Sequence, residues 1–240
     1  MFSGRIKILR TMLLVSLLTT GVYPSYAIGL LIDASDSGWY TNTGTHDPNN
    51  TNYTVGCCVD LSTFRNFFVF DVPPLSGPVD YAELRIFVSQ YNDTDDPSET
   101  YQLFDVQAPV LQVTSGGGVS VFNDLGVADL FASALGSAVV TAADEGRVIV
   151  VPLNQSGLTY LASGGGLVAF GGSIDSTLSF TGGEKVFGGS GLGLGTQQLF
   201  IHAVPEPTSM IFIALGLLTL IVSNRSRRAW LQDHVSRLFS

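Results

Sequence analysis

The sequence predicts a mainly β fold, a β-sandwich of the jelly-roll type, and three observations support this prediction. From Tyr81 to Val88, apolar residues alternate with Tyr81, Glu83, Arg85 and Phe87, which is typical of a strand with one buried face. From Asn66 to Val72 the chain is apolar on both faces, as in a central strand that Pro73 and Pro74 then end. Short strands separated by turns rich in Gly, Asn and Asp are typical of sandwiches.

Further strands are expected in the same region, to make a set of roughly six to eight. They are Tyr101 to Val106, Arg147 to Leu153, Leu167 to Phe170, Thr177 to Phe180 and Gln198 to Ala203. Helical spacing of apolar residues predicts two short helices, at Asn123 to Leu135 and Gln155 to Ala162, each closing one end of the sandwich.

The C-terminal part of the chain has the features of a membrane anchor in their usual order. Val204, Pro205, Glu206 and Pro207 precede residues 208–223, which contain no charged side chain and would span roughly 24 Å as a helix. A basic cluster follows: Arg225, Arg227 and Arg228. Because basic residues stay on the cytoplasmic side, we expect a single transmembrane helix with its C-terminus in the cytoplasm. A buried core helix is the alternative.

The N-terminus has the features of a secretory signal peptide. Arg5, Lys7 and Arg10 precede an apolar stretch, and Ser25-Tyr26-Ala27 has the small-x-small pattern of a cleavage site. We expect cleavage after Ala27, and an uncleaved anchor is the alternative. The expected organisation is therefore a signal peptide (1–27), a β-sandwich ectodomain (28–203), an anchoring segment (204–228) and a cytoplasmic tail (229–240).

The Val204-Pro205-Glu206-Pro207 motif, the apolar helix and the arginine cluster together resemble the PEP-CTERM sorting signal of Gram-negative bacteria. The resemblance implies that an exosortase recognises the chain in the inner membrane and cleaves it near the motif. It further implies that the protein then reaches the cell surface or the extracellular matrix, often together with exopolysaccharide production.

The expected ectodomain is strongly acidic. Between Ile28 and Val204 there are four basic residues, Arg65, Arg85, Arg147 and Lys185, against eighteen acidic ones, a net charge of −14. Nucleic acid is excluded as a partner because its binding requires Lys and Arg to displace counterions from phosphates.

The ectodomain also resembles exported jelly-roll modules similar to carbohydrate-binding ones. The segments that carry this resemblance are 33–40, 65–71, 82–85 and 164–172. Trp39, Tyr40 and Tyr53 lie among Thr and Asn residues and are candidates to stack on sugar rings, although they could equally be core or edge residues.

Catalytic patterns are sparse. The expected ectodomain has two histidines, His46 and His202, and no Gly-x-Ser-x-Gly or His-Glu-x-x-His motif. A glycosidase with two carboxylates stays open, because only the spatial separation of the carboxylates would identify it. We expect a non-catalytic structural or adhesive protein, with a carbohydrate-binding module and an extracellular hydrolase as the alternatives.

No cofactor is expected, but two acidic loops suggest a site for a structural calcium ion. Asp33 and Asp36 lie in one loop, and Asp93, Asp95 and Asp96 in the other. Calcium prefers carboxylate and carbonyl oxygens, but Asp is also common in solvated turns.

Cys57 and Cys58 are adjacent. A disulfide between neighbours would be strained because their α-carbons are only about 3.8 Å apart. We expect two free thiols, with a redox pair, a metal pair or an intermolecular link as alternatives.

Overall fold

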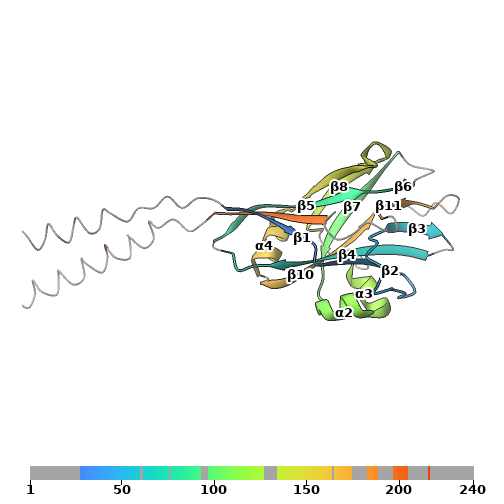
Figure 1. Ribbon diagram of the computed structural model, residues 1–240, viewed down its shortest axis with the longest axis horizontal. Helices are drawn as coiled ribbons and strands as arrows, with labels where there is room; N and C mark the ends of the chain where they lie inside the picture. The colour runs from blue at the N-terminus through green and yellow to red at the C-terminus, as the bar shows by residue number, and fades with distance from the viewer. Residues whose placement is uncertain are drawn as a thin grey trace, which may run out of the picture. The chain divides into compact units, whose positions relative to one another are not determined.

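A computed structural model describes residues 28–59, 62–75, 77–92, 97–126, 134–163, 165–174, 183–188, 197–204 and Gly216. Residues Ala27 to Val204 form one compact unit, and residues 1–26 and 205–240 form a second unit. The compact unit is the β-rich domain in Figure 1.

The order of elements is as follows. The strands are β1 (Ile28–Asp33), β2 (Asp36–Thr41), β3 (Val55–Val59), β4 (Ser62–Val72), β5 (Val79–Val88), β6 (Tyr91–Asn92), β7 (Ser98–Asp105), β8 (Gly136–Thr141), β9 (Arg147–Pro152), β10 (Gly166–Ile174), β11 (Lys185–Val186) and β12 (Gln197–Ala203). The helices are α2 (Val110–Ser115), α3 (Gly118–Asp124), the 3-10 turn η1 (Ala142–Asp144) and α4 (Gln155–Ser163).

Within the described residues the strands form two sheets with antiparallel pairing throughout. The four-stranded sheet has the order β1-β12-β5-β9. The larger sheet has the order β6-β11-β3-β4-β10-β7-β8, with β2 paired to β4. The domain is therefore the predicted mainly β, sandwich-like fold, because the two sheets bury a shared core between them.

This central core is built from the inward faces of both sheets. The strand β5 contributes Ala82, Leu84, Ile86 and Val88, all fully buried. The larger sheet contributes a set of aromatic and aliphatic residues that includes Phe68, Phe70, Val72, Tyr101 and Phe170. Burying each such side chain stabilises the fold by roughly 1.5–3 kcal/mol.

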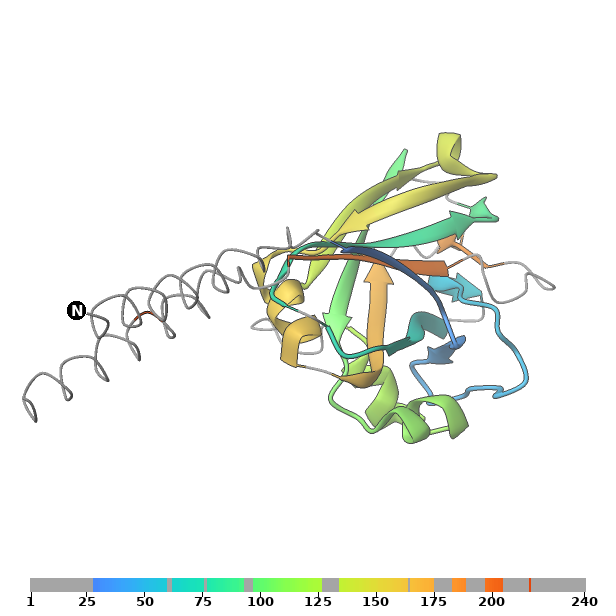
Figure 2. The ribbon, with the colours of Figure 1, turned by 60° about the vertical axis from the view of Figure 1, so that its left-hand side comes forward.

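A second core lies on the other face of the larger sheet. The helices α2 and α3 cover this face, below β2 and β4 in Figure 1 and at the bottom of Figure 2. Val113 from α2 and Phe122 from α3 pack there with Tyr40, Phe67 and Val69. The larger sheet is thus covered on both faces around β4, which explains why β4 is apolar on both faces.

Most of the predicted strands are confirmed. The alternation in β5 places its apolar residues in the core, and β4, β7, β9, β10 and β12 correspond to the other predicted strands except one, although β7 and β9 each end one residue earlier than predicted. That exception, Thr177 to Phe180, lies outside the described residues. Four strands of five or more residues were not predicted: β1, β2, β3 and β8.

One helix is confirmed and the other is not where it was expected. The helix α4 matches the prediction for Gln155 to Ala162. The predicted helix at Asn123 to Leu135 is wrong at its start, because α3 ends at Asp124 and Leu125 is its C-cap; residues 127–133 lie outside the described part. The helix α3 therefore lies earlier in the chain than the predicted helix, and its buried residues include Val121 and Phe122.

Candidate functional site

The four-stranded sheet has one face that no described helix covers. The side chains on it alternate with the core residues of the same strands, as the register of the sheet requires. We call it the outer face, and its residues are Gly29, Leu31 and Asp33 on β1, Gln198, Phe200 and His202 on β12, Tyr81, Glu83, Arg85 and Phe87 on β5, and Val148, Val150 and Pro152 on β9.

Apolar side chains make up much of this face. Leu31, Tyr81, Val148 and Val150 are all exposed, Tyr81 at 42% of its accessible surface. Their counterparts on the larger sheet, such as Phe67, are buried under α2 and α3. The outer face therefore presents a large apolar sheet surface that stays accessible to a partner.

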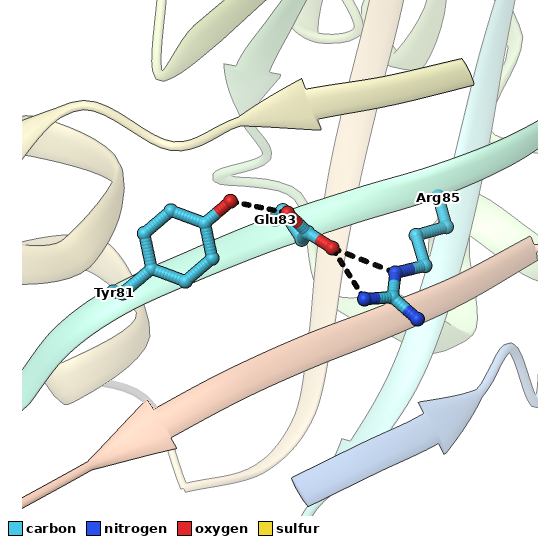
Figure 3. A network of polar contacts seen from close by, with 3 residues as sticks. All are labelled: Tyr81, Glu83 and Arg85. Atoms are coloured by element: carbon cyan, nitrogen blue, oxygen red, sulfur yellow. Dashed lines mark hydrogen bonds and ion pairs between the residues drawn. The ribbon is translucent and has the colours of Figure 1, made fainter. Parts of the chain in front are cut away.

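A polar network lies at the centre of the outer face, as Figure 3 shows. The Tyr81 hydroxyl donates a hydrogen bond to Oε2 of Glu83. Arg85 contacts the other oxygen, Oε1, through Nε at 2.7 Å and Nη2 at 2.6 Å. All three residues come from alternate positions of β5, so the strand itself sets their spacing.

Glu83 is buried although it belongs to the outer face. Its side chain is 8% exposed, whereas that of Arg85 is 36% exposed. Phe200 lies directly opposite Glu83 on β12, and Pro152 lies opposite it on β9. A buried carboxylate requires partners, and here both of its oxygens are hydrogen-bonded.

Phe200 organises the aromatic part of the network. The guanidinium carbon of Arg85 lies 5.1 Å from the centroid of the Phe200 ring, a cation-π contact. The Tyr81 ring lies 6.2 Å from the same ring at a tilt of 60°. The hydrogen bond to Glu83, helped by partial burial, raises the pKa of Tyr81 above its ordinary value. The phenol is thus a neutral donor in this network.

Two further polar contacts border the network. Nδ1 of His202 lies 2.5 Å from Oδ1 of Asp80, and Nε2 of Gln198 donates to Oδ1 of Asp33 at 2.8 Å. The outer face thus combines exposed apolar rings with fixed donors and acceptors. The alternation in the sequence predicts that Tyr81, Glu83 and Arg85 share an outward face. It does not predict their neighbours on β12, because these are more than a hundred residues away in the chain.

Two of the three residues proposed to contact sugars are core residues. Tyr40 and Tyr53 are fully buried, so neither offers a ring face to a ligand. The Tyr40 hydroxyl donates to the Val113 carbonyl at 2.6 Å, and that of Tyr53 donates to the Phe87 carbonyl at 2.8 Å. The sugar-contact hypothesis is wrong for these two tyrosines, because both serve packing.

Trp39 is the third candidate and is half-buried. Its ring packs edge-on against Phe64 with centroids 5.3 Å apart. It is not on the outer face but on the larger sheet, on the strand β2. The aromatic residues on the outer face are instead Tyr81, Phe87 and Phe200.

The residues of the calcium hypothesis are only partly described. Asp33 ends β1 and is bonded to Gln198, while Asp36 begins β2 and accepts a hydrogen bond from the Ser37 amide at 2.8 Å. Asp93, Asp95 and Asp96 lie outside the described residues. Among the residues that are described, no group of three acidic, His or Cys side chains is placed to hold a metal ion.

Burial raises the pKa of Asp36, and the nearby amide of Ser37 and the side chain of His46 offset part of this effect.

The expectation of two free thiols is wrong. Cys57 is fully buried in β3 and is disulfide-bonded, and the chain contains one other cysteine, Cys58. Within the described residues there is no free cysteine.

The last described residues of the domain lead directly into the expected anchoring segment. β12 ends at Ala203, and the Val204 amide donates to the Pro78 carbonyl at 3.0 Å. A family model described as a PEP-CTERM protein-sorting motif matches residues 203–228. The chain carries a PEP-CTERM sorting motif. The resemblance seen in the sequence is confirmed, and no curated protein matches the chain.

The PEP-CTERM motif implies an exported protein that an exosortase recognises, with a C-terminal membrane anchor before processing. Pro205, Glu206, Pro207, Arg225, Arg227 and Arg228 lie outside the described residues, as does Ala27 at the expected signal-peptide cleavage site. In the part of the chain that the structure describes, no helix is long and apolar enough to span a bilayer.

Proposed function

We propose that the domain of residues 28–203 is a non-catalytic adhesive module that is displayed at the cell surface or in the extracellular matrix and binds exopolysaccharide. The outer face of the four-stranded sheet is the observation that carries this proposal. The PEP-CTERM motif supports it by directing the chain out of the cell. The domain therefore meets extracellular polymers rather than cytoplasmic ligands.

The chemistry of the outer face suits a sugar polymer. Exposed Tyr81 and partly exposed Phe200 offer aromatic surface to the apolar C–H faces of sugar rings. Arg85 uses Nε and Nη2 for Glu83, while its Nη1 makes no hydrogen bond within the described residues. This nitrogen is a donor for a sugar hydroxyl, already oriented by the contact with Glu83.

The charge of the domain favours a neutral polysaccharide. A net charge of −14 between Ile28 and Val204 opposes the approach of acidic polymers and of anionic lipid surfaces. A second protein packed face to face here would bury the exposed part of the Arg85 guanidinium, which is unfavourable unless new partners replace the water. Hydroxyl groups of a neutral glycan can provide such partners.

Retention on neutral polysaccharide tests this function. The mature domain is passed over insoluble glucan and over exopolysaccharide prepared from the source cells, with Tyr81→Ala as the test variant. Loss of one aromatic contact weakens binding by about threefold to tenfold. Leu167→Ala is the matched control, because Leu167 is exposed on β10 of the other sheet. Equal retention of the two variants would count against the proposal.

A carbohydrate-binding module selective for one sugar is the second candidate. The oriented Nη1 of Arg85 favours it, because a fixed planar donor distinguishes hydroxyl arrangements better than an apolar surface does. The variant Arg85→Lys separates the two candidates. A selective module loses its preference among glucan, mannan and galactan, whereas a general adhesive surface weakens equally toward all three.

A further inference from the structure

The sorting motif begins inside the folded domain. Its matched residues start at Ala203, which is the last residue of β12 and is buried in the domain. The next residue, Val204, is tied to Pro78 by a backbone hydrogen bond of 3.0 Å. No linker therefore separates the sheet from Pro205, the first proline of the motif.

The end of β12 is held from both sides. Ala203 lies opposite Ile28 of β1 and opposite Val79 of β5, and Figures 1 and 2 show the blue β1 beside the orange-red β12. On the β5 side the register shifts between His202 and Ala203, which locally weakens the pairing. The contact of 2.5 Å between Asp80 and His202 lies at this point and joins the two strands.

The available length of chain is short. From Val204 to Pro207 there are three residue steps, at most about 11 Å of extended chain. A protease cleft must surround the bond that it cleaves, together with residues on both sides. The segment that such a protease binds would therefore extend to Ala203 and Val204, which are hydrogen-bonded to the domain.

The N-terminal signal does not face the same obstacle. The expected cleavage after Ala27 also adjoins a strand, since β1 begins at Ile28. However, β12 follows β1 by more than 160 residues in the chain, so β1 lacks this partner when the expected leader first becomes accessible. The sorting motif follows β12 in the chain, and both partners of β12 precede it.

We propose that processing of the sorting motif requires Ala203 and Val204 to detach from β1 and β5, and that this local opening sets the rate of processing. Cleavage breaks one peptide bond, whose acyl group passes to water or to an acceptor amine while the tail leaves with a new amino group. Opening changes how often this peptide bond is accessible to the protease. It does not change the chemistry of cleavage. When opening and closing are fast, cleavage follows the population of the open form.

A spacer tests the proposal directly. Gly-Ser-Gly-Ser is inserted between Val204 and Pro205, and the full chain is produced in cells that contain its exosortase. Conversion of precursor to mature protein is followed by pulse-chase and by mass spectrometry of the new C-terminus. We expect conversion to be about threefold to tenfold faster, the effect of one net hydrogen bond on an opening equilibrium. An unchanged or slower conversion overturns the proposal.

The same spacer inserted after Gly165 is the matched control. Gly165 is exposed, with open space around it, in the turn that precedes β10. We expect this chain to be processed at the rate of the unchanged protein. Acceleration by both insertions would show that the effect is not local, and would overturn the proposal.

Point variants test the opening without any change in chain length. Asp80→Asn removes the carboxylate that contacts Nδ1 of His202, and conversion should be about twofold to fivefold faster, as expected for an exposed contact. Asp71→Asn is the control, because Asp71 is an exposed carboxylate on β4. Slower conversion of Asp80→Asn alone would mean that the enzyme recognises the folded edge, which overturns the proposal. Neither readout depends on polysaccharide binding.

Discussion

Phe67 and Phe68 are consecutive residues of β4, both fully buried, and they pack into different cores. Phe68 faces the four-stranded sheet in the central core, and Phe67 faces α2 and α3 in the second core. Successive strand residues point to opposite faces, so this pair shows that β4 contributes to both cores. A sheet surface that the described helices leave uncovered is the outer face of the four-stranded sheet.

Replacing these two residues should have distinguishable effects. Phe68→Ala and Phe67→Ala should each lower the free energy of unfolding by about 3–5 kcal/mol, the usual cost of emptying an aromatic core position. Only Phe67→Ala should also increase hydrogen exchange in residues 110–124, because it loosens the cover formed by α2 and α3. Urea denaturation and exchange mass spectrometry measure both. Equal exchange in 110–124 for the two variants would contradict the assignment.

The Tyr40 hydroxyl connects β2 to the covering helices. It donates to the Val113 carbonyl at 2.6 Å and accepts from the Gly117 amide at 3.0 Å. Tyr40→Phe should lower the free energy of unfolding by about 1–3 kcal/mol, because buried backbone groups lose their partner. Thr100→Val is the control, since Thr100 is exposed on β7 and should change stability by less than about 0.5 kcal/mol. Thermal melts that place both variants at the same midpoint would refute the role of Tyr40.

Tyr101 should make the domain sensitive to alkali. Burial raises the pKa of Tyr101 well above its ordinary value of 10, although the hydrogen bond to Asn66 lowers it slightly. Above about pH 10 the unfolded chain therefore loses this proton and the folded chain keeps it. Stability should fall as pH rises above 10, by about 1.4 kcal/mol per pH unit for this group.

Tyr101→Phe tests the alkaline effect. The variant removes the titrating group and should reduce the slope of stability against pH above 10 by that amount. It should also lower stability near pH 7, because Oδ1 of Asn66 loses its donor at 2.9 Å. Tyr40 and Tyr160 also have raised pKa values through burial and will leave part of the slope in place. An identical slope in both proteins would exclude Tyr101 as its source.

Gly172 should not tolerate a side chain. A β-carbon there would lie 1.9 Å from the Tyr101 hydroxyl and 2.3 Å from Oδ1 of Asn66. Gly172→Ala should therefore break the buried Tyr101–Asn66 hydrogen bond and lower the free energy of unfolding by more than about 2 kcal/mol. Gly165→Ala is the control, because nothing lies within 4 Å of its β-carbon position. Similar melting temperatures for the two alanine variants would contradict the close packing at Gly172.

Several elements could be predicted because their signals are local. The alternation of Tyr81 to Val88 and the proline end of β4 depend only on neighbouring residues, and both predictions are confirmed. β1 and β2 were missed for a similar reason. The first is a short apolar run without clear alternation, and the second begins with Asp, Ser and Gly, which usually indicate a turn.

The site could be predicted only in part. The pattern of β5 places Tyr81, Glu83 and Arg85 on one face, but it does not reveal that Phe200 lies opposite Glu83. It also does not reveal that Tyr40 and Tyr53 are in the interior. Both depend on strand pairing over long distances, and a run of aromatic residues among Thr and Asn is compatible with either a binding loop or a core.

The sequence by itself determined the sorting motif and the mainly β character of the domain, because a contiguous motif and a period of two need no distant partner. Only the tertiary structure decided which sheet face stays uncovered, which aromatic rings reach solvent, and that the motif begins on a paired strand. These features depend on which segments become neighbours, and that choice is made by burial of the two cores as a whole rather than by any local stretch of chain.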